Sequence, residues 1–166
     1  MTGLCFLDAD VLVYARDPTD AVKQRRAQGW LDRLWADGTG RISTQVLAQF
    51  YRVTTRELAF PLAPDEAWAD VEALFSWDPQ PTDASTMERA HRVEGRYRLG
   101  WWDCLVVAAA QAQHCRLLLS EDLQDGAVYD GLTVRDPFRL SVEEAVDTYG
   151  EAPKPRYARR PSAMRA

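Results

Sequence analysis

The sequence predicts an α/β domain with three layers, α/β/α, in which helices cover both faces of a central parallel sheet. Short apolar runs of strand length, such as residues 4–7 and 116–120, alternate with long segments whose apolar residues recur at helical spacing. This alternation is typical of α/β folds. An acid lies at or just beyond the end of both runs, and open α/β sheets place ligands at the carboxyl ends of their strands.

The chain has the size of a single domain with a basic extension. Its 166 residues, 46% of them hydrophobic, are enough for one core. From residue 149 onward, five basic residues and one acid give a charge of +4, which leaves −9 for the rest of a chain whose net charge is −5. We therefore expect a domain at 1–148 and a basic, Pro-containing, disordered tail at 149–166. An acidic domain argues against general nucleic-acid binding and leaves only local basic patches for that purpose.

No segment of the sequence is suited to crossing a membrane. The longest apolar run, at 104–110, is far too short, and the N-terminus lacks the basic flank and long apolar core of a signal peptide. Cys5, Cys104 and Cys115 are odd in number, lack metal-type spacing and stand among apolar residues. We expect buried thiols and a cytoplasmic protein.

The predicted elements follow from periodicity and from turn residues. Strands are expected at 4–7, 41–43, 116–120 and 132–134, and helices at 21–36, 44–54, 64–75, 83–99 and 100–110. Thr44 is the expected cap of the helix at 44–54, and Ser141 with Glu144 forms a capping box for a last short helix. Several aromatic side chains are expected on inward faces, namely Trp30, Trp35, Trp68 and Phe75.

Basic and aromatic residues lead into the helix at 100–110. Arg92, Arg96 and Arg98 form either a solvated face or a set of phosphate contacts near a site. Trp101 and Trp102 are either core and interface residues or platforms on which bases stack. Spacing alone leaves both pairs of alternatives open.

Three aspartates lie at the ends of apolar elements. Asp8 ends the first strand, Asp122 follows the strand at 116–120, and Asp103 heads the apolar stripe of the helix at 100–110. An ionised acid in such a place needs a hydrogen bond, an ion pair or a cation. Taken singly, Asp103 is also explained as an acid at a helix N-terminus, and Asp8 as a helix cap or Asx turn. Together, at one end of a parallel sheet, they predict a divalent-metal site.

The predicted ion is Mg²⁺ or Mn²⁺. Hard cations take oxygen ligands and keep several waters, so two or three carboxylates suffice. Asp8 and Asp103 are the strongest ligand candidates, and Asp122 and Asp125 would act through water. Such an ion activates water and offsets the charge that develops in phosphodiester cleavage. The sequence has no Gly-rich phosphate loop and no Cys/His pattern of a zinc site. Both histidines lie on predicted helices, which argues against a Ser-His-Asp mechanism.

Four motifs stand at the predicted site elements. They are FLDADVLVY at 6–14, ISTQVLAQFY at 42–51, WDCL at 102–105 and LSEDLQDG at 119–126. In this order they resemble the motifs of PIN-domain ribonucleases, most closely the VapC-type toxins of toxin–antitoxin pairs, over about residues 4–137. The resemblance implies a PIN fold and a metal-dependent endoribonuclease that forms a homodimer and is inhibited by a small antitoxin. It implies acidic site positions at Asp8, Asp103 and Asp122, with Ser43 and Ser120 as supporting polar residues.

The chain departs from the family pattern at three positions. Gln49 stands where the family usually has Glu; its amide oxygen can ligate a hard cation but brings no charge and cannot act as a base. Alternatively, Gln49 is an ordinary helix-surface amide. Ala9 replaces the usual Thr or Ser, and Asp10 replaces the common Asn. We hypothesise that Asp10 restores part of the missing charge, which requires its side chain to turn toward the metal.

Two functions from different classes fit these residues. The first is the metal-dependent nuclease that cleaves RNA. The second is a catalytically weakened or inactive PIN-fold module that binds RNA or an antitoxin, in which Gln49 marks the lost activity. Metal-dependent RNA cleavage distinguishes the two. An ordinary α/β domain with incidental acids would require four ordered motifs to coincide.

Overall fold

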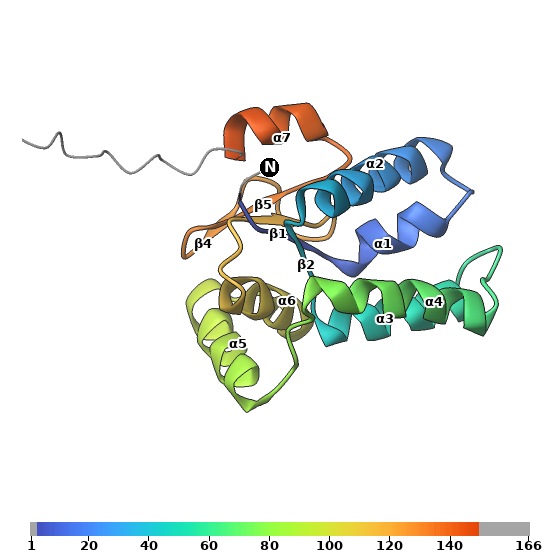
Figure 1. The fold of residues 1–166 in the computed structure, drawn as a ribbon. Coiled ribbons are helices and arrows are strands. Elements are labelled where there is room, and N and C mark those ends of the chain that lie inside the picture. Colours follow the sequence, from blue (N-terminus) through green and yellow to red (C-terminus); the bar gives the residue numbers. More distant parts are fainter. Residues whose placement is uncertain (1–2, 150–166) are drawn as a thin grey trace, which may run out of the picture.

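The central sheet has five strands in the order β2–β1–β3–β5–β4. The computed structural model describes residues 3–149, whose arrangement Figure 1 shows. The elements in chain order are β1 Cys5–Leu7, α1 Ala9–Arg16, α2 Ala21–Asp37, β2 Gly40–Arg41, α3 Thr44–Arg56, α4 Pro64–Leu74, a 3₁₀ turn Phe75–Trp77, α5 Ala84–Tyr97, α6 Trp101–Ala112, β3 Leu117–Leu119, β4 Val128–Tyr129, β5 Leu132–Arg135 and α7 Val142–Tyr149.

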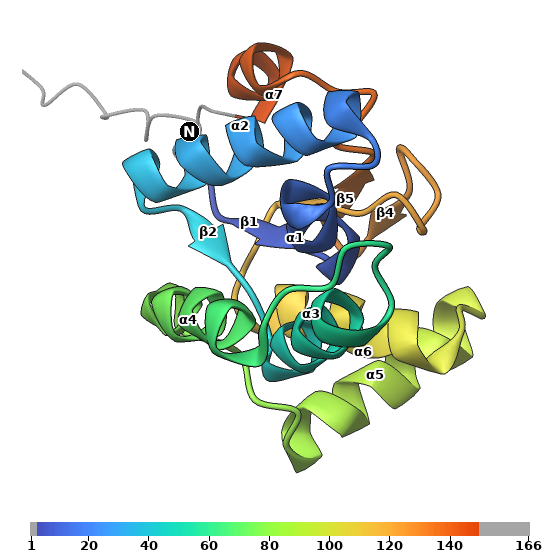
Figure 2. The same cartoon turned by 90° about the vertical axis from the view of Figure 1, so that its right-hand side faces the viewer.

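Helices cover both faces of the sheet. Figures 1 and 2 show α2 and α7 on one face and α3 to α6 on the other. Helix α1 lies between the two layers and contacts both α2 and α3. The predicted three-layer α/β/α fold with a central parallel sheet is therefore confirmed.

The sheet brings the ends of β1 and β3 together. Strand β1 pairs in parallel with β2 and β3, and β3 pairs in parallel with β5. Leu7 stands opposite Leu119 in this register, so the residues that follow both central strands emerge at the same edge. All three residues of each central strand are buried, as expected for strands covered on both faces.

Two predictions near β2 are wrong by one or two residues. The strand spans Gly40–Arg41 instead of 41–43. The cap of α3 is Ser43 instead of Thr44, because the backbone of Ser43 is extended and its hydroxyl accepts the Val46 N–H at 3.2 Å. A Cβ on Gly40 would lie 2.5 Å from the Trp77 ring, so this position requires glycine, which the sequence alone did not indicate.

Several aromatic residues predicted to face inward lie at the surface. Trp68 and Phe75 are 46% and 50% exposed, because the buried stripe of α4 passes through Ala67, Val71 and Leu74. Trp68 instead stacks edge-to-face on Tyr51 and Phe75, both with ring centroids 6.1 Å away. Trp35 is likewise partly exposed and packs on Trp77, whereas Trp30 is buried as expected.

The hairpin of β4 and β5 was missed in part. Only its second strand was predicted, at 132–134. Asp130 and Gly131 both adopt positive φ, at 50° and 87°, which is the backbone of a tight hairpin turn. The dipeptide Asp-Gly between two short apolar runs is the signal that could have found β4.

The C-terminal prediction is only partly within the described chain. The capping box of Ser141 and Glu144 is present, with each side chain accepting the other's backbone N–H. Helix α7 ends at Tyr149, the first residue of the predicted tail, and residues 150–166 lie outside the described residues. Across residues 3–149, no helix is long and apolar enough to span a bilayer.

Candidate metal centre

Asp8 is held at the edge of the sheet by its own backbone and by Ser120. It follows β1 directly, and its N–H donates to the Leu119 carbonyl at 3.0 Å. Its Oδ1 accepts the Ala9 N–H at 2.8 Å, which caps α1, and its Oδ2 accepts the Ser120 hydroxyl at 2.8 Å. The side chain is only 6% exposed. The orientation of this carboxylate is therefore fixed, and the interpretation as a helix cap is correct without excluding a ligand.

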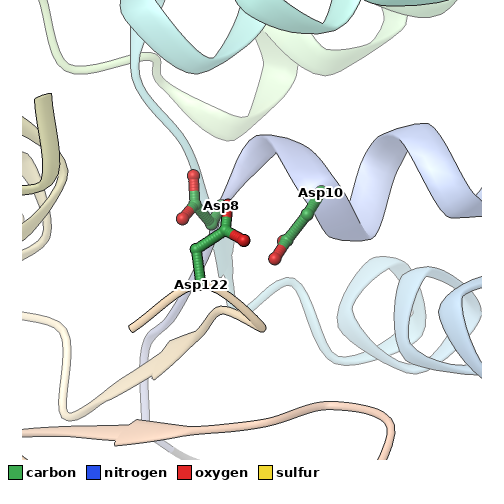
Figure 3. A group of neighbouring side chains, drawn as sticks. All are labelled: Asp8, Asp10 and Asp122. Carbon is green, nitrogen blue, oxygen red and sulfur yellow. The ribbon is translucent and has the colours of Figure 1, made fainter. Parts of the chain in front are cut away.

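Asp10 and Asp122 complete a group of three carboxylates, the acidic trio of Asp8, Asp10 and Asp122. One carboxylate oxygen from each lies within 4.8 Å of the other two. Figure 3 shows the side chains approaching one another from the start of α1 and from the loop after β3. Asp10 accepts the Val11 N–H at Oδ1 and the Glu121 N–H at Oδ2, both at 2.6 Å. The side chain of Asp10 thus turns toward Asp8 and Asp122, as our hypothesis requires.

The electrostatics of the trio favour a cation. Burial, together with the charges of Asp122 and Asp103, raises the pKa of Asp8 to about 6, against the lowering effect of the hydrogen bonds from Ser120 and Ala9. The pKa of Asp10 is also raised, first by burial and then by the charge of Asp8. Within residues 3–149, no Lys, Arg or His forms an ion pair with any member of the trio. A divalent cation with hard oxygen ligands fits this donor set.

Asp103 lies near the trio but not within it. It is in the first turn of α6, where an acid complements the helix dipole. Burial and then the charge of Asp122 raise its pKa, and its own charge acts on Asp8. Its carboxylate is outside the group that lies within 4.8 Å. The structure therefore places Asp103 on the rim of the trio, whereas Asp10 is one of its three members.

The remaining predicted residues have other surroundings. Ser43 is buried as the cap of α3. Gln49 is exposed on α3, and its side-chain amide forms no hydrogen bond with a described residue. Asp125 accepts from Arg135 Nε at 2.8 Å and from the Asp136 N–H at 2.9 Å, and the latter contact contributes most to lowering its pKa. The structure thus pairs Asp125 with Arg135 and does not bring it into the trio.

The basic candidates and Trp102 lie on the surface, whereas Trp101 is partly buried and packs against the hydrophobic core. Arg92, Arg96 and Arg98 are exposed on or after α5, and Arg96 pairs with Asp130 at 2.8 Å. Arg98 is the C-cap of α5, with φ of 57°. Trp102, beside Asp103, is 69% exposed, which corrects the interpretation of this residue as part of the core.

Glu121 and Lys23 are contacts of the site that sequence analysis missed. The Glu121 N–H donates to Asp10, and the Glu121 carboxylate forms an ion pair with Lys23 on α2. The signal available in the sequence was the position of Glu121 between Ser120 and Asp122. No sequence pattern connects it to Lys23, which is 98 residues away.

Comparisons with known proteins identify the family and the fold. The family model described as PIN domain matches residues 5–125. Among curated proteins none matches. Several solved structures resemble the chain. One is a toxin–antitoxin complex from Klebsiella pneumoniae (TM-score 0.59, 18% identity, 80% of this chain and 97% of that one). Others are the Sarcin-Ricin loop cleaving toxin VapC20 from Mycobacterium tuberculosis (TM-score 0.53, 17% identity, 71% of this chain and 89% of that one) and VapBC2 from Rickettsia felis bound to a DNA fragment from its promoter (TM-score 0.57, 15% identity, 80% of this chain and 98% of that one). At these identities the structural likeness shows the fold.

Proposed function

The chain belongs to the PIN-domain family, and from this premise we propose that it is a metal-dependent endoribonuclease and the toxin of a toxin–antitoxin pair. The observation that carries the proposal is the convergence of Asp8, Asp10 and Asp122 at the carboxyl edge of the sheet. No basic side chain among residues 3–149 forms an ion pair with this trio, and burial, together with the charges of Asp122 and Asp103, raises the pKa of Asp8. Such a group of carboxylates is suited to a divalent cation.

In this mechanism Asp8, Asp10 and Asp122 would hold Mg²⁺ or Mn²⁺. Such an ion, when bound, would supply an activated water and offset charge on the scissile phosphate. Ser120 and the Ala9 N–H fix the two oxygens of Asp8, and the Glu121 N–H fixes Asp10, so the carboxylates are oriented before the substrate arrives. Asp103 adds negative charge on the rim, and the exposed Arg92 and Arg98 are proposed contacts for RNA phosphates.

The proposed partners are an RNA substrate, a small cognate antitoxin and a second copy of this chain. The structural neighbours described as a toxin–antitoxin complex and as VapBC2 support an antitoxin. The three cysteines are buried and free, which suits the reducing cytoplasm that we propose as its location. Sedimentation of the purified chain, with and without a co-expressed antitoxin, tests both protein partners.

A second candidate function is a PIN-fold module that binds RNA or antitoxin with little catalysis. The observation that favours it is Gln49, a neutral, exposed residue at the position where the resemblance leads us to expect Glu. Losing a charge weakens metal affinity, so this module would retain its surfaces while cleaving slowly.

Cleavage of a structured RNA pool, with Mn²⁺ or with EDTA, decides between the two. The nuclease predicts metal-dependent cutting that disappears in Asp8→Asn. If the wild type cuts nothing, Gln49→Glu is the next protein to assay. Activity recovered by that substitution would identify residue 49 as the lesion, whereas continued inactivity with retained RNA or antitoxin binding would establish the binding module.

A further inference from the structure

We propose that Lys23 is a positioning residue of the metal centre: through its ion pair with Glu121 it holds the loop that carries Asp122 against α1, and so sets the affinity of the acidic trio for a divalent cation. The inference rests on the proposed function, because it concerns the same trio. Lys23 itself belongs to α2 and is not a ligand.

Lys23 is held on several sides. Its ammonium forms an ion pair with the Glu121 carboxylate and donates to the Tyr14 hydroxyl at 3.3 Å. It also lies 4.5 Å from the centroid of the Tyr14 ring and 5.0 Å from that of Phe138, within the range of cation–π attraction. The two rings support each other edge-to-face, with centroids 5.0 Å apart. Tyr14 is on α1, so Lys23 connects the loop, α1 and α2 at one point.

Glu121 links Lys23 to the trio, because its carboxylate pairs with Lys23 and its N–H donates to Asp10. Residues 120–122 each belong to the trio or contact it: the Ser120 hydroxyl donates to Asp8, the Glu121 N–H donates to Asp10, and Asp122 is a member. Asp122 is exposed and accepts no hydrogen bond from a described residue. Its position therefore depends on its neighbours, and the Lys23 ion pair fixes the nearest of them.

The sign of the effect separates positioning from simple electrostatics. Lys23 is positively charged, and the hydrogen bond with Glu121 is the main reason why its pKa is raised. Removing a positive charge near three carboxylates would by Coulomb's law tighten the binding of a cation. If Lys23 acts by positioning, its removal weakens binding instead, because the trio loses its geometry.

The test is Mn²⁺ titration of the full-length, metal-free protein by calorimetry, for the wild type, Lys23→Met, Lys23→Arg and Arg52→Met. Arg52 is a matched control, since its ion pair with Glu57 lies on the exposed end of α3. We expect about tenfold weaker binding in Lys23→Met, affinity within about threefold of wild type in Lys23→Arg, and no change in Arg52→Met. Hydrogen exchange of the Glu121 N–H, measured without metal, should be faster in Lys23→Met alone.

The outcomes of the titration distinguish failure of the positioning role of Lys23 from failure of the proposed metal centre. Unchanged or tighter Mn²⁺ binding by a folded Lys23→Met protein, as judged by its melting curve, overturns the positioning role. If that variant does not fold, Lys23→Gln, which keeps a polar group at the same place, takes its position in the titration with the same expected weakening. A wild type that binds no Mn²⁺ would instead overturn the proposed metal centre and the inference with it.

Discussion

The proposed site has two halves that are built differently. The strand-end half, Asp8, Asp10, Ser120 and Asp122, follows β1 and β3, and both oxygens of Asp8 and of Asp10 accept hydrogen bonds. The helix half, Gln49 on α3 and Asp103 on α6, projects from two helices, and neither side chain is hydrogen-bonded to a described residue.

This difference coincides with two of the positions at which the chain departs from the family pattern. Parallel pairing of β1 with β3 places Leu7 opposite Leu119, so the residues that follow the two strands lie close together. Gln49, one departure from the family pattern, lies in the less constrained half, and Asp10, another departure, adds a carboxylate to the more constrained one. Our hypothesis is that Asp10, in the first turn of α1, offsets the charge that Gln49 lacks.

The largest effect is expected when the strand-end half loses its central ligand. Asp8→Asn removes a charge and a fixed oxygen, so Mn²⁺ affinity should fall by about a hundredfold, the largest loss typical of substitutions among residues that support metal ligands. Asp103→Asn, on the rim, should reduce the affinity by about tenfold or less. Calorimetric titration of both variants measures this, and a larger loss in Asp103→Asn would reverse the ranking of the two halves.

The metal-free protein should become less stable as the pH rises. The pKa of Asp8 is about 6 in the fold against an ordinary value of 3.8, so between these pH values the folded state binds more protons than the unfolded state. This group therefore stabilises the fold below about pH 4, and that contribution, about 3 kcal/mol at most, is lost as the pH rises through 6.

Asp8→Asn provides the control for this pH dependence. Urea unfolding of the wild type and of Asp8→Asn, both free of divalent ions, should give stabilities whose difference grows in favour of the variant from pH 4 to pH 7. Parallel pH profiles for the two proteins would show that Asp8 titrates normally.

A smaller change in Mn²⁺ affinity is expected when a carboxylate is removed from the strand-end half and another is added to the helix half. Asp10→Asn should weaken Mn²⁺ binding by about tenfold, because the trio loses one of its carboxylates. Adding Gln49→Glu to that variant should recover part of the affinity if the helix half faces the same ion. No recovery, with both proteins folded, would separate residue 49 from the metal centre.

The smallest effect is expected at Asp125. Its carboxylate is bound to Arg135 and to the Asp136 N–H, so Asp125→Asn should cost roughly 1 kcal/mol of stability or less and leave Mn²⁺ affinity unchanged. A clear loss of affinity would show that Asp125 takes part in the site after all.

The sequence was most informative where local patterns determine structure. The buried runs before Asp8 and Ser120 predicted the two central strands, and strand ends in a parallel sheet must meet, so the proximity of Asp8 to Asp122 followed from topology. The capping box at Ser141 is a local motif and was correct.

What the sequence did not reveal depends on contacts between distant segments. The outward turn of Trp68 depends on its packing against Tyr51 and Phe75, and the need for glycine at position 40 comes from Trp77. Asp125, like Asp122, follows the strand at 116–120 and was therefore a candidate ligand, yet its side chain accepts a hydrogen bond from Arg135. The partner of Glu121, Lys23, could be known only from the packing of α2 beside the loop.

The most direct test of the central claim is the anomalous scattering of Mn²⁺ in crystals of the protein. The acidic trio predicts a peak within coordination distance of Asp8, Asp10 and Asp122, and its loss in Asp8→Asn. A peak elsewhere, such as at Asp125, or no peak at an ion concentration that supports RNA cleavage, would contradict a metal centre at the strand ends.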